Sequence, residues 1–182
     1  AGVGLARKIG MDEAVRRFHD VGNDKGVIVC FDADTKCDLD YLRTVESEFK
    51  QQSKIKAASI YFEHPIAGIE YDSEVYKNIV LYELHLRYYK NGLAFAKLPC
   101  DFHTIGSSMA VRANAYASQG GMNRRKAGED FYFLQKFMEI DGLYTIQTTR
   151  TIPSPRPSHR VPFGTGKAIQ QSLDNEKDLK FS

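Results

Sequence analysis

The chain has 182 residues, of which 42% are apolar, and a formal net charge of +2. It is long enough for one domain with a sizeable core, and its near-neutral charge gives no reason to expect a nucleic-acid partner. Its three cysteines, Cys30, Cys37 and Cys100, lack CxxC spacing, which argues against a zinc site or a disulfide framework and fits a reducing compartment. No apolar run approaches the roughly 20 residues of a membrane span, and no signal peptide is visible.

Helical and strand-like patterns alternate along the chain, which predicts a layered α/β architecture. Apolar residues at helical spacing predict helices over 6–19, 39–51, 75–90, 113–119, 129–140 and 168–179. Apolar and β-branched runs predict strands over 27–31, 55–62, 107–112 and 143–147. Between 151 and 167, four prolines and two glycines exclude regular structure and predict a long loop of the kind that often has a function.

Two of the predicted helices have apolar stripes that we expect to face the core. In the helix over 6–19 the stripe consists of Ala6, Ile9, Ala14 and either Val15 or Phe18. In the helix over 39–51, with Asp38 as its N-cap, it consists of Leu39, Leu42, Val45 and Phe49.

Asp32-Ala33-Asp34 follows directly on the apolar run 27–31. Residues two apart on an extended chain point to the same face, so two carboxylates converge where a buried strand ends. Neighbouring like charges are costly unless a cation lies between them. The simplest such cation is Mg²⁺ or Mn²⁺, which prefers oxygen ligands and often shares them with phosphate.

A second acidic pair, Glu129-Asp130, follows Gly128 and opens the predicted helix over 129–140. Carboxylates at a helix N-terminus are stabilised by the helix dipole, so a capping role is one interpretation of this pair. A catalytic role is the other, because a carboxylate at the start of a helix can be aimed at a substrate.

The order of the motifs resembles the family 2 glycosyltransferases, which have the GT-A fold. The matching segments are 4–10, Asp32-Ala33-Asp34, 106–112, Gly120-Gly121 and Gly128-Glu129-Asp130. They span nearly the whole chain, and their order and spacing are more specific than any one of them. The resemblance implies that 1–182 is a single, partial GT-A domain with a metal site, an acceptor side and a C-terminal loop over 151–167. The expected architecture is a three-layer α/β/α sheet that lacks its first strands.

The resemblance also implies a reaction. Asp34 and Asp32 would hold Mg²⁺ or Mn²⁺ against the diphosphate of a nucleotide-sugar donor, and the cation would neutralise the leaving nucleoside diphosphate. Asp130 would be the base that takes the proton of the acceptor hydroxyl, with Glu129 as second choice, and the anomeric centre would be inverted. The implied acceptor is a carbohydrate or a lipid-linked molecule, the setting polysaccharide biosynthesis, and the location the cytoplasm, including the inner face of the membrane.

Basic residues complete the implied donor site. Arg156 and Arg160 in the loop resemble the family's phosphate-binding segment and could form charge-assisted bonds with a diphosphate. His159 is a candidate third metal ligand, although a single loop histidine is more often just solvated. Arg7 is a further candidate for donor contact, with an exposed helix charge as the alternative.

The chain departs from the family at its beginning, because the strand-loop-helix unit that binds the nucleotide base has no counterpart here. We therefore expect weak or no activity from this chain alone. We also expect an open sheet edge beside the strand that leads to Asp32, and an exposed edge favours self-association.

Two other functions remain open. Phe31-Asp32-Ala33-Asp34-Thr35 also looks like the motif of haloacid-dehalogenase-like phosphatases, in which the first aspartate is a nucleophile. That family has no role for the segment 106–121, and no well-placed lysine precedes Glu129-Asp130. A non-catalytic fragment that binds glycan or a protein partner is the third interpretation.

Overall fold

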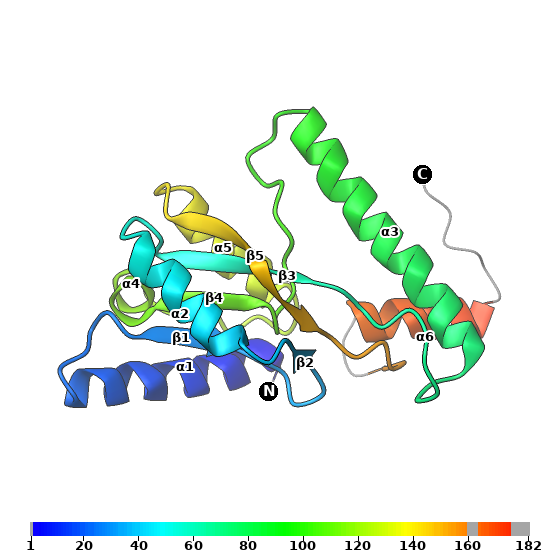
Figure 1. Cartoon of the computed structure of the whole chain (residues 1–182), viewed down its shortest axis with the longest axis horizontal. Coiled ribbons are helices and arrows are strands. Elements are labelled where there is room, and N and C mark those ends of the chain that lie inside the picture. Colours follow the sequence, from blue (N-terminus) through cyan, green and yellow to red (C-terminus); the bar gives the residue numbers. More distant parts are fainter. Residues whose placement is uncertain (1, 160–163, 176–182) are drawn as a thin grey trace.

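The computed structural model describes residues 2–159 and 164–175. This part of the chain is a mixed α/β structure with one five-stranded sheet (Figure 1). The strands are β1 (Val27–Cys30), β2 (Lys36–Cys37), β3 (Ala57–Phe62), β4 (Met109–Arg112) and β5 (Leu143–Ile152). The helices are α1 (Val3–Asp20), α2 (Tyr41–Gln51), α3 (Ser73–Phe95), α4 (Ala113–Ser118), α5 (Glu129–Met138) and α6 (Thr165–Asn175).

The strand order is β1-β4-β3-β5-β2. β3 and β5 run parallel, whereas β1 with β4, β4 with β3, and β2 with β5 are antiparallel. In the β1–β4 ladder Val27 lies opposite Arg112 and Cys30 opposite Met109. β1 therefore forms one edge of the sheet built by the described residues, and the chain leaves that edge strand directly into Asp32.

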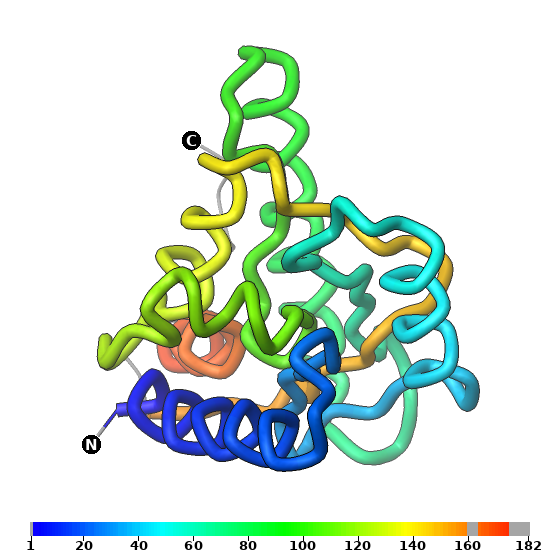
Figure 2. Tube along the Cα trace, turned by 90° about the vertical axis from the view of Figure 1, so that its left-hand side faces the viewer, coloured from blue at the N-terminus to red at the C-terminus, as the bar shows by residue number. Residues whose placement is uncertain are grey.

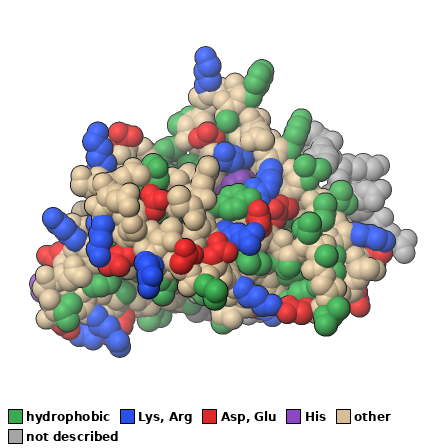
Figure 3. Space-filling view, in the orientation of Figure 1, with side chains coloured by type: hydrophobic (Ala, Val, Ile, Leu, Met, Phe, Trp, Pro, Cys, Tyr) green, Lys and Arg blue, Asp and Glu red, His purple; other side chains and the backbone are tan. Residues whose placement is uncertain are grey.

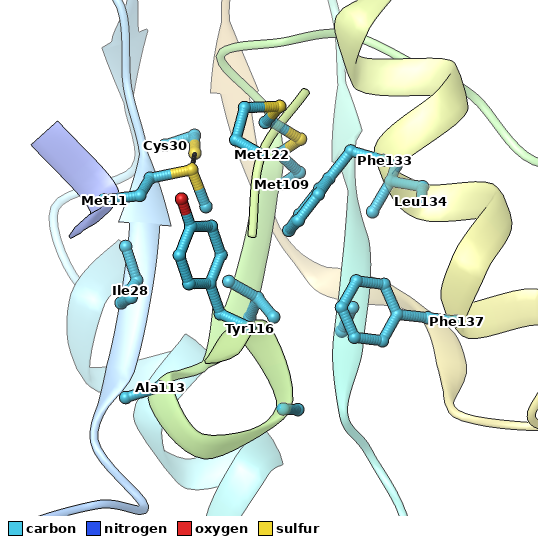
Figure 4. Close-up of a cluster of buried hydrophobic side chains, with 13 residues drawn as sticks. Met11, Ile28, Cys30, Met109, Ala113, Tyr116, Met122, Phe133, Leu134 and Phe137 are labelled. Carbon is cyan, nitrogen blue, oxygen red and sulfur yellow. Dashed lines mark hydrogen bonds between the residues drawn. The ribbon is translucent and has the colours of Figure 1, made fainter. Parts of the chain in front are cut away.

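Helices cover both faces of the sheet, with α2 on one side and α4 and α5 on the other (Figure 2). One core cluster contains Met11, Met109, Tyr116, Phe133 and Phe137 from α1, β4, α4 and α5 (Figure 4). The other contains Tyr41, Val45, Phe49, Ile60 and Ile146 between α2 and the sheet. β1 contributes to both clusters: Ile28 and Cys30 face the first, and Val27 and Val29 the second. This packing on two sides explains why the strand 27–30 is continuously apolar, whereas Phe31 beyond its end is 42% exposed.

α3 extends beyond the sheet and packs near its start against α6 (Figure 1). Val75 and Ile79 of α3 and Ile169 of α6 form a third, smaller buried cluster. None of the described helices is both long and apolar enough to cross a membrane.

The observed elements lie close to the predicted ones, with informative differences. β2 was not predicted, because two residues are too short for a periodic pattern. β5 continues to Ile152 because its second half pairs with β2 and with Tyr61 and Phe62 of β3. α6 begins at Thr165, inside the predicted loop. Residues 176–179, the predicted end of that helix, lie outside the described residues.

The predicted apolar faces were partly wrong. In α1, Ala6 and Ile9 of the predicted stripe are exposed, Ile9 to 63%, and the half-buried residues are Ala14, Val15 and Phe18. The buried residues of this helix are instead Gly4 and Met11. The helix lies so close to the segment 123–125 that a Cβ at Gly4 would stand 2.4 Å from the carbonyl oxygen of Arg125.

In α2, Val45 and Phe49 are buried as expected, but Leu39 and Leu42 are exposed. The helix begins later than predicted, with Asp40 at the N-cap position. Asp38 instead accepts hydrogen bonds from the backbone N–H and the Nε of Arg150 at 3.1 Å.

Candidate functional site

Asp32 and Asp34 lie in the turn between β1 and β2, where the Thr35 N–H donates to the Asp32 carbonyl at 3.0 Å. Their side chains are about half exposed, at 46% and 40%. Each carboxylate has its own arginine: Arg7 lies 2.9 Å from Asp32, and Arg156 lies 2.6 Å from Asp34. The positive charge that two neighbouring carboxylates require is therefore supplied by two guanidinium groups.

Arg7 joins the two acidic motifs. Its Nη2 contacts Asp32 and its Nε contacts Glu129 at 3.1 Å, across 122 positions of sequence. The side chains of Arg7 and Glu129 are only 11% and 5% exposed. Burial acts to lower the pKa of Arg7, but the charges of Asp32 and Glu129 outweigh it and raise that pKa above its ordinary value.

Three glycines with positive φ lie in the segment that connects α4 to α5. Gly120 and Gly121 have φ of 72°, which ends α4 in a conformation that favours glycine. Gly128 has φ of 69° and occupies the N-cap position of α5. Asn123 supports the turn, because its side-chain amide donates to the Glu129 carbonyl at 2.9 Å.

Glu129 and Asp130 differ in environment although they are neighbours in sequence. Glu129 is buried and bound to Arg7. The Asp130 carboxylate accepts the Phe131 N–H at 2.8 Å. Burial, and then the negative charge of Glu129, raise the pKa of Asp130 from 3.8 to about 6. A carboxylate with a pKa near neutrality is suited to accept a proton, whereas the carboxylate of Glu129 is paired with Arg7.

The segment after β5 crosses the Asp34 turn. Pro153 and Pro155 are buried, and Ser154 contacts the Tyr71 hydroxyl at 2.9 Å. These anchors hold Arg156, whose Nε donates to Asp34 at 2.6 Å. The Ser158 N–H donates to the Gly166 carbonyl at 2.8 Å, which ties this segment to the start of α6.

The predicted metal ligands are not gathered into one cluster. His159 is exposed, and in the described part of the chain no three His, Cys, Asp or Glu side chains form a group that could hold a metal ion. Arg160 lies outside the described residues. Asp32 and Asp34 alone still fit Mg²⁺ or Mn²⁺ of the type that is held by one or two carboxylates and completed by phosphate and water.

A buried polar cluster beside the middle of α3 was not predicted from sequence. His64 is fully buried, with Nδ1 2.9 Å from Glu83 and Nε2 3.3 Å from the Thr165 hydroxyl of α6. Burial acts to raise the pKa of Glu83, but hydrogen bonds from His64 and Arg87 lower it to about 2. No sequence signal marks this cluster, because its members come from three distant segments.

Two further perturbed groups adjoin this cluster, because Phe62 contacts both His64 and His103, and His64 contacts Tyr82. Burial, and then Arg87 and Lys90, lower the pKa of His103 to about 4, so the imidazole is neutral at physiological pH. Burial raises the pKa of Tyr82, although a hydrogen bond with Thr165 acts to lower it.

The acidic site is distinct from a groove elsewhere on the sheet. That groove, of about 760 Å³, lies beside the edge strand β1, and its wall includes Val27, Val29, Leu42, Phe49 and Arg112.

Charged side chains of both signs are interspersed over the face of the molecule in Figure 3, in keeping with the net charge of +2.

Comparisons with known proteins do not place the chain in a family. No protein-family model, no curated protein and no solved structure matched it. The functional argument therefore depends on the motifs and on the geometry described above.

Proposed function

We propose that this chain is part of a metal-dependent, inverting glycosyltransferase of family 2 with a GT-A fold. One observation carries the proposal: Arg7 contacts both Asp32 at the end of β1 and Glu129 at the start of α5. Two acidic motifs that the resemblance assigns to one active site thus lie on either side of one guanidinium. The mixed sheet, with β1 leading into Asp32 from its edge, supports the partial GT-A architecture.

The donor side is formed by Asp32 and Asp34. Mg²⁺ or Mn²⁺ held there would neutralise the charge that develops on the leaving nucleoside diphosphate. Arg156 is half exposed and reaches Asp34 from the segment after β5. A guanidinium in this position can turn from the carboxylate to a phosphate oxygen, which it binds with the same geometry.

The acceptor side is formed by Asp130. The acceptor oxygen forms a bond to the anomeric carbon while the bond from that carbon to the diphosphate oxygen breaks and its electron pair leaves with the diphosphate. The hydroxyl proton passes to the Asp130 carboxylate, which is mostly ionised at neutral pH because its pKa is about 6. Attack opposite the leaving group inverts the anomeric centre. The proposed acceptor is a carbohydrate or lipid-linked hydroxyl, in polysaccharide biosynthesis at the cytoplasmic side of a membrane.

The edge of β1 is the proposed self-association surface, with a second copy of the chain as its occupant. The Gly26 carbonyl accepts the Ala113 N–H at 2.8 Å. Because bonded and non-bonded pairs alternate in an antiparallel ladder, Val27 and Val29 direct their backbone groups away from β4. The strand carries no charge or proline that would prevent pairing with another strand.

The test is protection of the fold by ligand. We expect Mn²⁺ together with UDP or GDP to raise the Tm of the chain, and Asp34→Ala to abolish the shift, because a ligand that binds the folded state stabilises it. Asp130→Asn should keep the shift and, in a longer chain that includes the nucleotide-binding unit, should abolish sugar transfer. Asp101→Asn, the same chemical change at an exposed aspartate, is the matched control.

Two results would refute the proposal. One is an unchanged Tm with every nucleoside diphosphate and metal tested. The other is release of inorganic phosphate from a generic phosphate ester in an Asp32-dependent manner, which is the activity of the haloacid-dehalogenase-like alternative.

A further inference from the structure

The two arms of Arg7 make different contacts. Nη2 reaches Asp32 after β1, and Nε reaches Glu129 at the start of α5. Arginine presents its donors in a rigid planar fork, so two carboxylates bound to one guanidinium are fixed relative to each other. A lysine ammonium is a point charge on a flexible stem and imposes no such geometry.

Gly106 leaves the space that this fork occupies. A Cβ built on Gly106 would lie 2.4 Å from Nη2 and 2.9 Å from Cζ of Arg7, closer than atoms can pack. Gly106 does not have a positive φ, so its backbone conformation does not require glycine. The steric requirement for glycine at this position therefore comes from Arg7.

Burial of the Arg7–Glu129 pair is weak evidence for a role in stability. Removing charges from water is costly, and apolar side chains of similar volume often stabilise a core as well or better. An ion pair that is buried at the junction of two acidic motifs is better explained by the geometry it imposes.

We infer that Arg7 is a positioning residue, which holds Asp32 and Glu129 in one arrangement, and that Gly106 is glycine in order to admit its guanidinium. The inference rests on the proposed function. With Glu129 held by Arg7, the next residue of α5, Asp130, is the carboxylate left for the acceptor. Asp32 is likewise held at the end of β1 for the donor side.

A double-mutant cycle tests the contact without any need for activity. Gly106→Ala should lower the Tm in the wild-type background by at least about twice the amount seen in the Arg7→Ala background, because the clash is lost with the guanidinium. Gly92→Ala is the control, because a Cβ at Gly92 meets nothing within 4 Å. Equal effects of Gly106→Ala in both backgrounds would overturn the inference.

Kinetics then separate positioning from donor binding. Arg7→Lys keeps the charge but loses the fork, so in a longer chain that includes the nucleotide-binding unit kcat should fall about 10- to 100-fold while the KM for the donor changes little. Full activity in Arg7→Lys, or a raised KM with unchanged kcat, would show that charge or donor contact is the role of Arg7 and would overturn the inference.

The two proposals fail in different ways. If nucleoside diphosphate and metal do not raise the Tm, the glycosyltransferase proposal is refuted. If they do raise it, but the effects of Gly106→Ala and Arg7→Ala on the Tm are additive, only the role of Arg7 is refuted.

Discussion

Asp130→Asn should make the protein more stable at neutral pH while it removes the proposed base. The folded state holds the pKa of Asp130 at about 6, against an ordinary value of 3.8, chiefly through burial and secondly through Glu129. The difference is about 2 pKa units, and each unit corresponds to about 1.4 kcal/mol, so ionised Asp130 lowers the free energy of unfolding by about 3 kcal/mol. Asparagine keeps an oxygen for the Phe131 N–H but has no charge.

The stabilisation expected from Asp130→Asn should increase as the pH rises. Below about pH 3 the carboxyl is protonated in both the folded and the unfolded state, so ionisation makes no difference to stability. Between about pH 3 and 6 the unfolded state loses its proton first, and the stability of the wild type falls as the pH rises. Above pH 6 the penalty is complete. The stability advantage of Asp130→Asn should therefore be near zero at about pH 3 and reach up to about 3 kcal/mol at about pH 8.

Urea unfolding of the wild type and of Asp130→Asn at a series of pH values measures this difference. Asp101→Asn, at an exposed position, should leave the curve nearly unchanged at every pH. A stability difference between Asp130→Asn and the wild type that does not depend on pH, or a variant that is less stable at pH 8, would refute the electrostatic reasoning.

Further outcomes are expected from single substitutions. Arg156→Gln should tighten Mn²⁺ binding several-fold in calorimetry, because the half-exposed guanidinium competes with the cation for Asp34; unchanged or weaker binding would contradict this. Gly92→Ala should raise the free energy of unfolding by roughly 0.5–1 kcal/mol through helix propensity, since the site is exposed and open. Phe137→Ala, in the fully buried cluster, should cost about 3–5 kcal/mol in urea unfolding. Sedimentation should show concentration-dependent association that Val27→Lys reduces, and a monomer at all concentrations would argue against pairing through β1.

Much of the fold could be predicted from local patterns. β1, β4 and α5 have continuous apolar runs or helical spacing with clear ends, such as Gly128 before α5. The failures occurred where a pattern was short or where a neighbour decided the outcome. β2 is two residues long and exists only because β5 lies beside it, and no periodicity can report such a pairing.

The choice of buried face on α1 also depended on a neighbour. Ile9 is more hydrophobic than Gly4, yet Ile9 is exposed and Gly4 is buried, because the backbone of 123–125 packs directly against the helix there. A glycine permits this close approach, and an apolar-stripe argument assigns glycine no weight.

The sequence by itself determined where the acidic groups stand: Asp32 and Asp34 after an apolar strand, and Glu129 and Asp130 at a helix start. Only the tertiary structure decided what each of them contacts and how deeply it is buried. Glu129 and Asp130 are chemically alike in sequence, but burial beside Arg7 makes one a bound partner, while burial beside Glu129 raises the pKa of the other to about 6. The arginine that links the two motifs is 122 residues from Glu129, and a contact at that separation follows from how the helices pack on the sheet, which no local pattern records.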